Sequence, residues 1–245
     1  MSEQIVLFDI PSRERSCWSL NPWKTRMLLN YKGLDYRTEW LEYPEVKPAL
    51  EPHVPPNPTG IPYTVPTIRQ PSGSYIMESR AIANTLETLH PSPPLHLDAP
   101  VLAELEALMQ RMMGQLGAEM LLRVPQRVLG PASVPFWMED RKAWVGGVEL
   151  EAYAAGVDRG KMWEEAEVVL REATGLLKKG GKEAEGPFFL GREVSYADFV
   201  WGGFLVFVKA QGEDFFEELL RRTGDAEAHR RLLEAVGPWM KRSSH

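Results

Sequence analysis

Cysteine is almost absent from this chain: Cys17 is the single one among 245 residues. One cysteine excludes an intrachain disulfide and a dithiol redox cycle, and it is typical of a reducing compartment. The five histidines have no metal-ligand spacing, and no glycine-rich phosphate loop occurs. We therefore expect no resident metal ion.

Long apolar runs and an excess of positive charge are also missing. No stretch of about 18 apolar residues occurs, so we expect no segment to span a membrane. The chain has 28 Lys and Arg against 34 Asp and Glu, a net charge of −6, which argues against nucleic-acid or anionic-membrane partners. The first residues, Met-Ser-Glu-Gln, lack the basic start and apolar run of a signal peptide. These absences favour a soluble, cytoplasmic protein.

The first part of the chain has alternating strand and helix patterns. Its hydrophobic periodicity and turn residues predict β-α-β followed by β-β-α, and Gly33 is placed to end the first helix. Residues 44–63 are rich in proline and are expected to form a loop without helix or sheet. The predicted strands are 5–10, 36–43, 64–69 and 75–78, and the second helix is 79–89.

Beyond a proline-rich segment, nearly all of the chain has helical periodicity. Two long apolar stripes step by three and four residues, as the buried faces of helices do. Ser195 and Asp198 form a capping-box pattern at the start of a further, mostly apolar helix. We therefore divide the chain into an α/β domain at 1–90, a linker at 91–98 and an all-helical domain at 99–245.

The most informative pair of motifs is Val65-Pro66 and Glu78-Ser79. Proline cannot donate to a sheet ladder, so Pro66 belongs at a strand start or edge. If the Val65–Pro66 bond is cis, the turn exposes the backbone groups of Val65 to a bound peptide. Ser79 is predicted to be a helix N-cap, and a helix N-terminus attracts a carboxylate, whereas Glu78 can accept an ammonium. γ-Glutamyl-cysteinyl-glycine, which is glutathione, carries the complementary groups.

This combination of a cis-proline α/β half and a helical half resembles the cytosolic glutathione transferase superfamily, whose fold is thioredoxin-like at the N-terminus and all-α at the C-terminus. It is most similar to the fungal etherase-related, serine-type members, relatives of bacterial β-aryl ether-cleaving enzymes. The segments that carry the resemblance are Asn57–Gly60, Val65-Pro66, Glu78–Ile82, Gly191 and Ser195–Asp198, and more closely Trp18–Arg26 and Leu28–Leu34.

The resemblance implies a glutathione transferase in which Ser19 holds the glutathione thiolate. It implies that Val65, Pro66, Glu78 and Ser79 bind glutathione, the co-substrate. The second substrate would be a small apolar electrophile, aromatic, enone or ether. A homodimer and a role in detoxification or secondary metabolism are further implications of the resemblance.

The chemistry of Ser19 is compatible with that role. A free thiol has a pKa of roughly 8.5, and lowering it by about two units needs roughly 2.7 kcal/mol. One hydroxyl donor to a charged acceptor supplies about 1.5–3 kcal/mol, and a helix N-terminus adds about 0.3–1 kcal/mol. The alternative interpretation is that Ser19 is only an N-cap, or that Asn21-Pro22 starts the helix instead.

Other assignments stay open at this point. Cys17 could be a nucleophile that forms a mixed disulfide with glutathione, or it could be a small buried hydrophobe. Lys47 and His53 could reach the glycine carboxylate of glutathione, or they could be surface residues of the loop. The alternative functions are an isomerase or lyase of a biosynthetic pathway on the same scaffold, and a non-catalytic binder of apolar ligands.

Overall fold

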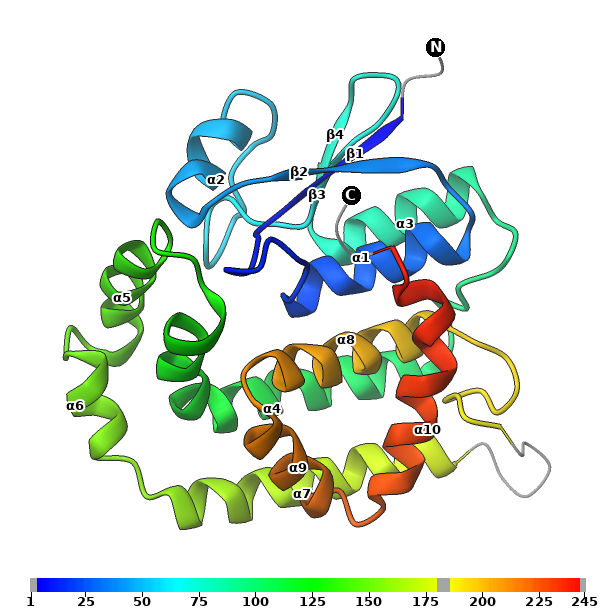
Figure 1. Cartoon of the computed structure of the whole chain (residues 1–245). Coiled ribbons are helices and arrows are strands. Elements are labelled where there is room, and N and C mark those ends of the chain that lie inside the picture. The colour runs from blue at the N-terminus through cyan, green and yellow to red at the C-terminus, as the bar shows by residue number, and fades with distance from the viewer. Residues whose placement is uncertain (1–3, 180–185, 243–245) are drawn as a thin grey trace.

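The computed structural model describes residues 4–179 and 186–242 and shows an α/β half above a helical half (Figure 1). The elements of the α/β half are β1 (Ile5–Asp9), α1 (Leu20–Tyr31), β2 (Tyr36–Trp40), α2 (Tyr43–Leu50), β3 (Thr67–Arg69), β4 (Tyr75–Met77) and α3 (Ser79–Leu89). Those of the helical half are α4 (Pro100–Arg123), η1 (Val124–Val128), α5 (Val134–Lys142), η2 (Ala143–Val145), α6 (Leu150–Ala155), α7 (Arg159–Lys178), α8 (Tyr196–Ala210), α9 (Glu213–Arg222), α10 (Ala226–Val236) and η3 (Gly237–Met240).

The sheet has the strand order β2-β1-β3-β4. β1 is parallel to β2 and antiparallel to β3, and β3 is antiparallel to β4. Every residue of β1 is buried, as expected of a central strand that is covered on both faces. Helices α1 and α3 lie between the sheet and the helical half (Figure 1). This arrangement confirms the predicted thioredoxin-like domain joined to an all-α domain.

The end of α1 follows the sequence prediction. Gly33 has φ +63°, a conformation that glycine adopts without strain. Its amide donates to the carbonyl of Asn30 at 3.2 Å, and the amide of Leu34 donates to the carbonyl of Leu29 at 3.0 Å. These two bonds form a Schellman motif, which satisfies carbonyls that the helix leaves free at its end.

The prediction that residues 44–63 contain no helix is wrong, because α2 forms there. Glu42 caps this helix: its carboxylate accepts from the backbone of Glu45, whose own carboxylate accepts the amide of Glu42 at 2.8 Å. Pro44 lies in the first turn, where a missing amide proton breaks no helical bond. The capping box therefore outweighs the proline content.

All four strands are shorter than predicted, β1 and β4 by one residue and β2 and β3 by three. β2 ends at Trp40, because Glu42 already belongs to the cap of α2. β3 begins at Thr67, because the preceding Val65–Pro66 bond is cis and turns the chain out of the ladder.

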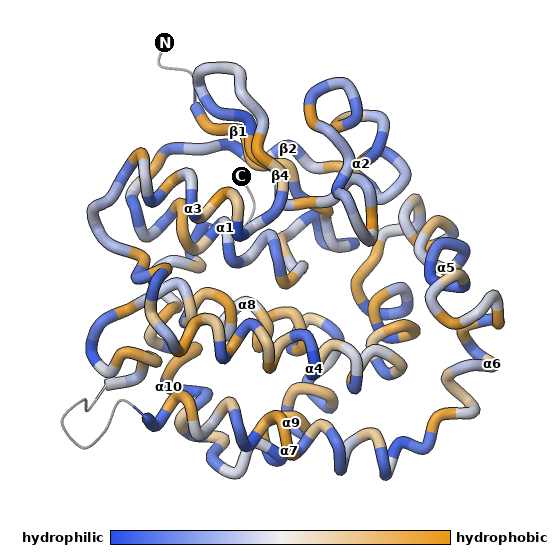
Figure 2. Tube along the Cα trace, turned by 180° about the vertical axis from the view of Figure 1, so that it is seen from behind, coloured by the Kyte–Doolittle hydropathy of each residue, from blue (hydrophilic) through white to orange (hydrophobic). Residues whose placement is uncertain are grey.

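Helix α8 forms the centre of the helical half and also its contact with the α/β half. Nearly all of its residues are buried, and Figure 2 shows it apolar along most of its length. Gly203 of α8 packs on the first turn of α1: a Cβ there would lie 3.0 Å from the carbonyl oxygen of Leu20. Absence of a side chain at Gly203 is therefore what lets the two helices approach.

The C-terminal end of the described chain returns to the α/β half (Figure 1). Asn30 Nδ2 donates to the carbonyl of Trp239 at 2.6 Å, and the hydroxyl of Tyr36 donates to the carbonyl of Arg242 at 3.0 Å. Arg242 also pairs with Asp35 at 3.1 Å. No helix within residues 4–179 and 186–242 combines the length and apolarity needed to cross a membrane.

Candidate functional site

The strand register brings the predicted site residues to one edge of the sheet. Phe8, near the end of β1, faces Thr67, the first residue of β3, which faces Met77, the last residue of β4. The chain after β1 leads to Ser19 at the start of α1. Pro66 comes directly before β3, and Glu78 comes directly after β4, so both lie at the same end of the strands. These neighbouring positions define a candidate site.

Ser19 is the N-cap of α1, with φ −77° and ψ 138°. Its carbonyl accepts the amide of Trp23 at 3.1 Å, but its Oγ makes no capping hydrogen bond. Asn21 lies inside the first turn and is not the cap. The first turn has no acidic residue, so nothing neutralises the positive end of the helix dipole. The half-buried Ser19 hydroxyl is thus free to donate to an anion at a helix N-terminus.

The Val65–Pro66 peptide bond is cis. The carbonyl of Pro66 accepts the amide of Glu78 at 3.2 Å, which ties the two motifs together. In the described part of the chain, neither the amide nor the carbonyl of Val65 has a hydrogen-bond partner. Half-buried backbone groups of this kind are normally paired, so they can pair with an extended ligand.

Glu78 is held in an unusual backbone conformation, with φ +78° and ψ 126°. Such a conformation costs a non-glycine residue of order 1–3 kcal/mol. Its Oε1 accepts from Asn57 Nδ2 at 2.9 Å and from the hydroxyl of Thr64. Oε2 has no hydrogen-bond partner among the described residues and is left for a cation.

The predicted N-cap of α3 is corrected by one residue. Glu78 is the cap, because its carbonyl accepts the first helical amide, that of Ile82, at 2.9 Å. Ser79 is the first helical residue and is buried. Both residues still lie at the N-terminus of α3, where free amides and the helix dipole favour an anion.

The helical half supports this site through Tyr196. Its buried hydroxyl donates to the carbonyl of Ser79 at 3.1 Å, and its amide donates to the carbonyl of Leu95 at 2.8 Å. The predicted capping box is present beside it: Asp198 accepts the amide of Ser195 at 2.7 Å. The capping motif thus starts α8 and also holds the first residue of α3.

Lys47 and His53 differ in how available they are. Lys47 lies on α2 with its side chain mostly exposed and 3.9 Å from Glu51. His53 is stacked on Tyr75, with ring centroids 4.3 Å apart and an interplanar angle of 3°. Both side chains are exposed, but Lys47 is free to move, whereas the ring of His53 is held in place by Tyr75 of β4.

Comparisons with known proteins cover both halves of the chain. Residues 18–89 match the glutathione S-transferase N-terminal domain, and residues 103–239 match the glutathione S-transferase C-terminal domain. The chain belongs to the glutathione S-transferase family. The chain is 29% identical over 254 residues to the glutathione S-transferase-like protein ustS of Aspergillus flavus, covering 96% of the chain and 89% of the relative.

Two solved fungal structures share the whole fold of this chain. A glutathione S-transferase of Ceriporiopsis subvermispora, crystallised with glutathione, has 31% identity and a TM-score of 0.83. The match covers 97% of this chain and 98% of that one. The glutathione transferase GSTFuA3 from Phanerochaete chrysosporium has 26% identity and a TM-score of 0.78, with 98% of each chain covered.

Cys17 is a free cysteine, and it lies two residues before Ser19. It is buried, with 7% relative exposure, and its thiol lies within hydrogen-bonding reach of the Asp9 carboxylate. Burial raises the pKa of the thiol well above its usual range, and the nearby carboxylate adds to this. A buried, protonated thiol is a poor nucleophile. The structure therefore favours a packing role for Cys17.

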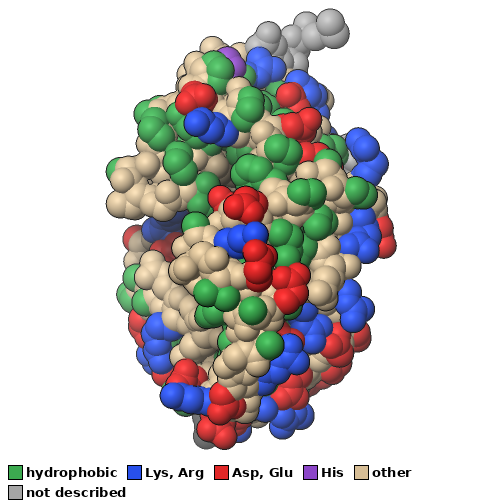
Figure 3. All heavy atoms as spheres, turned by 90° about the vertical axis from the view of Figure 1, so that its left-hand side faces the viewer, with side chains coloured by type: hydrophobic (Ala, Val, Ile, Leu, Met, Phe, Trp, Pro, Cys, Tyr) green, Lys and Arg blue, Asp and Glu red, His purple; other side chains and the backbone are tan. Residues whose placement is uncertain are grey.

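Aromatic and apolar side chains are exposed on the side of the molecule that carries α2, α5 and α6. Phe136 is 41% exposed and stacks on Tyr43, and Trp144 is 60% exposed. Figure 3, which views that side, shows hydrophobic side chains among charged ones over its upper and middle parts, and a lower part in which charged side chains are more numerous. No group of three His, Cys, Asp or Glu in the described ranges is suited to a metal ion.

Sequence reasoning missed three side chains that shape the site: Asn57 and Thr64, which hold Glu78, and Tyr196, which holds Ser79. Asn57 had been noticed only as part of a motif. Thr64 immediately precedes Val65, which was a usable signal, because a hydroxyl beside a predicted turn often binds a nearby acceptor. Tyr196 is distant in sequence and gave no signal of its role.

Proposed function

We propose that this protein binds glutathione along the edge formed by the cis-proline and the N-termini of α1 and α3. The free amide and carbonyl of Val65 pair with the cysteinyl backbone, and Pro66 holds that turn. Oε2 of Glu78 takes the γ-glutamyl ammonium. The N-terminus of α3, at Ser79, attracts the γ-glutamyl carboxylate. Ser19 then donates its hydroxyl proton to the thiolate.

The observation that carries this proposal is the unpaired Oγ of Ser19 at the start of α1. A hydroxyl donor to a thiolate supplies about 1.5–3 kcal/mol, and the helix N-terminus about 0.3–1 kcal/mol. Together they are enough to lower a thiol pKa by about two units, which needs roughly 2.7 kcal/mol. A substantial fraction of bound glutathione is then ionised at neutral pH.

The thiolate attacks an electrophilic carbon of a small apolar substrate. A carbon–sulfur bond forms and the leaving group departs with its electron pair, as an anion or, after protonation, an alcohol. With an enone, the thiolate adds to the β-carbon, the electron pair of the double bond moves to form an enolate, and the enolate takes a proton from water. Conjugation and thiolytic ether cleavage both follow this course and consume one glutathione per turnover. An isomerase on the same scaffold releases glutathione unchanged. Glutathione consumption at steady state therefore separates these reactions.

The experiment is a pH titration of thiolate absorbance in the complex with glutathione. For the wild type we expect the thiol pKa to fall by about two units from its free value. Ser19→Ala is expected to move it back by at least one unit with little loss of affinity, and Ser74→Ala, in an exposed turn, should have no effect. An unchanged thiol pKa in Ser19→Ala contradicts the role of Ser19. Absence of saturable binding to the wild type contradicts the whole proposal.

A further inference from the structure

The ammonium of Lys24, on α1, is close enough to Glu78 and to Glu106 of α4 to be attracted by both carboxylates. Lys24 is in the second turn of α1, and its Nζ donates to Oδ1 of Asn21 at 2.8 Å. The side chain thus folds back toward the N-terminus of its helix, as helical side chains do. The charged groups that act on it are Glu106 of α4 and Glu78 at the start of α3.

Neither carboxylate neutralises Lys24 directly. Glu106 pairs with Arg80 at 3.1 Å, and Oε1 of Glu78 is taken by the two neutral donors described above. Within residues 4–179 and 186–242, no carboxylate lies within 4 Å of the Lys24 ammonium, and Asn21 is its only hydrogen-bond partner. Two of its three protons are therefore not used by the protein.

Burial makes the lack of a close counter-ion unfavourable for the charged form of Lys24. Burial lowers the pKa of Lys24 to about 8, against the attraction of Glu106 and Glu78. Partial loss of solvent, without a close counter-ion, destabilises the charged form of a lysine. A bound carboxylate would restore the missing counter-ion. The cluster is therefore poised for an anionic group next to the free oxygen of Glu78.

We propose that Lys24 binds the α-carboxylate of the γ-glutamyl group, together with the N-terminus of α3. The γ-glutamyl group carries an ammonium and a carboxylate on the same carbon. Glu78 and Lys24 present the complementary pair of opposite charges, so the two residues read the amino-acid end of the peptide as a unit. This inference rests on the proposed function and makes Lys24 a specificity-determining residue for it.

The test uses calorimetry with three ligands whose thiol is methylated, so that thiol ionisation does not contribute. The first is S-methylglutathione, the second has a 4-aminobutyryl group in place of γ-glutamyl and lacks the α-carboxylate, and the third has a glutaryl group and lacks the α-amine. Lys24→Met is expected to bind the first and third ligands roughly ten- to hundredfold more weakly than the wild type. Its affinity for the second should be unchanged.

Two further variants make the result specific. Lys24→Arg keeps the charge and should retain most of the affinity for S-methylglutathione. Lys161→Met removes an exposed lysine from α7 and should bind all three ligands as the wild type does. The unliganded Lys24→Met protein should be at least as resistant to urea as the wild type, because a desolvated charge has been removed.

Two results overturn the role of Lys24. The first is that Lys24→Met binds all three ligands as tightly as the wild type does. The second is an equal loss of affinity for all three ligands, which would indicate a general structural role. Failure of the proposed function looks different, because the wild type itself then binds none of the ligands.

Discussion

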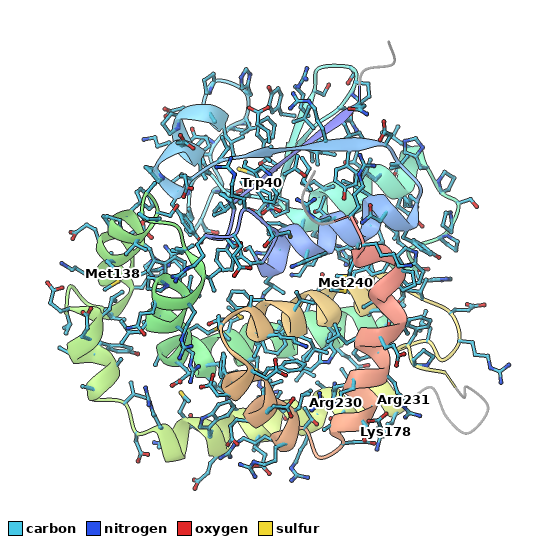
Figure 4. All side chains as sticks on the ribbon, in the orientation of Figure 1. Trp40, Met138, Lys178, Arg230, Arg231 and Met240 are labelled. Carbon is cyan, nitrogen blue, oxygen red and sulfur yellow. The ribbon has the colours of Figure 1, made fainter. Side chains whose placement is uncertain are left out.

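Nη2 of Arg26 lies 2.9 Å from Oδ2 of Asp9, and neither side chain is exposed to solvent. Arg26 is on α1 and Asp9 is the last residue of β1, so the pair joins the helix that begins beside Ser19 to the central strand. Nε and Nη1 of Arg26 have no hydrogen-bond partner among the described residues. The rings of Tyr36 and Trp40 lie 5.7 and 5.3 Å from its guanidinium carbon, and Trp40 is labelled at the end of β2 in Figure 4. These aromatic faces take the place of further acceptors.

Removal of the charge on Asp9 should be strongly destabilising. Asp9→Asn leaves the buried guanidinium of Arg26 without its counter-ion, and breaking a buried pair costs about 3–5 kcal/mol. We expect a matching loss in the free energy of unfolding by urea. The control is Asp35→Asn, which breaks an exposed pair with Arg242 and should leave the urea midpoint nearly unchanged. Equal effects of the two substitutions would contradict the importance of burial.

Cys17 should be chemically silent in the folded protein. A chromogenic aromatic disulfide is expected to label it very slowly at pH 7.5 and completely in guanidinium chloride, because burial raises the thiol pKa and blocks access. An exposed control, Ser74→Cys in the turn before β4, should react rapidly at one additional site. Cys17→Ala should keep its glutathione-dependent turnover. Fast labelling of Cys17 in the folded protein, together with loss of turnover in Cys17→Ala, would support Cys17 as the nucleophile.

Contact between the two halves should be sensitive to one methyl group. In Gly203→Ala the new Cβ meets the carbonyl of Leu20 at 3.0 Å, so the first turn of α1 must move. We expect a loss of about 1–3 kcal/mol in unfolding free energy and a reduced kcat, because Ser19 precedes that turn. Gly175→Ala is the matched control: a Cβ there meets nothing within 4 Å, and alanine should stabilise α7 by about 0.5–1 kcal/mol. Stabilisation by both substitutions would show that the close packing is absent.

Local features of this site could be predicted from sequence. Val65-Pro66 and Glu78-Ser79 are adjacent residues whose meaning follows from backbone chemistry, and the capping box at Ser195 spans only four positions. The chemistry of residues close together in the sequence indicates all three, so no knowledge of packing is needed. The cap of α3 was misplaced by one residue, because Ser is a common N-cap and Glu in a left-handed conformation is rare.

Contacts that depend on packing could not be predicted in this way. The bond from Tyr196 to the carbonyl of Ser79 joins residues 117 positions apart, and the Asp9–Arg26 pair requires β1 and α1 to be docked. Nothing in the sequence near Lys24 indicates that its side chain is desolvated. Glu78 and Glu106, the carboxylates that act on it, lie 54 and 82 positions further along the chain. Helix α2 was missed for a different reason: it begins in a proline-rich segment, and its capping box uses Glu42, which is not one of the usual N-cap residues.

His229 is buried and held in one neutral tautomer. Its Nδ1 accepts Trp201 Nε1–H at 2.8 Å, and its Nε2 lies 2.8 Å from the hydroxyl of Thr174. The hydroxyl of Thr174 donates its own proton to the carbonyl of Thr223 at 2.7 Å. The hydroxyl oxygen therefore accepts a hydrogen bond from His229, and the proton of that bond is on Nε2. Burial lowers the pKa of His229 to about 4, the charge of Lys178 acts in the same direction, and that of Asp225 opposes it. Figure 4 shows Lys178, Arg230 and Arg231 gathered near α10.

Protonation of His229 should therefore destabilise the fold. Its pKa is about 4 in the folded state and about 6.5 when unfolded, so the unfolded chain binds more protons between these values. The stabilisation is complete above pH 6.5 and is lost as the pH falls toward 4. The stability deficit of His229→Asn relative to the wild type should thus shrink by about 2–3 kcal/mol between pH 7 and 4.5.

The comparison with His229→Asn is needed because Asp198 acts in the opposite direction. Burial raises its pKa from 3.8 to about 6, so its contribution favours the folded state as the pH falls through that window. In the pH dependence of wild-type stability, the contributions of His229 and Asp198 therefore oppose each other, and neither can be read from it alone. A deficit in His229→Asn that stays constant from pH 7 to 4.5 would show that His229 does not titrate as proposed.

The strained backbone of Glu78 predicts a conflict between stability and binding. Glu78→Gly and Glu78→Ala both remove the carboxylate and should lose affinity for glutathione. Glycine accepts φ +78° without strain, whereas alanine does not, so the glycine variant should be more stable by about 1 kcal/mol in urea unfolding of the free protein. Equal stability would mean that the backbone relaxes without cost. The positive φ of Glu78 places Oε1 against Asn57 and leaves Oε2 open. A glutamate at a position that favours glycine is therefore explained if its carboxylate is needed for binding.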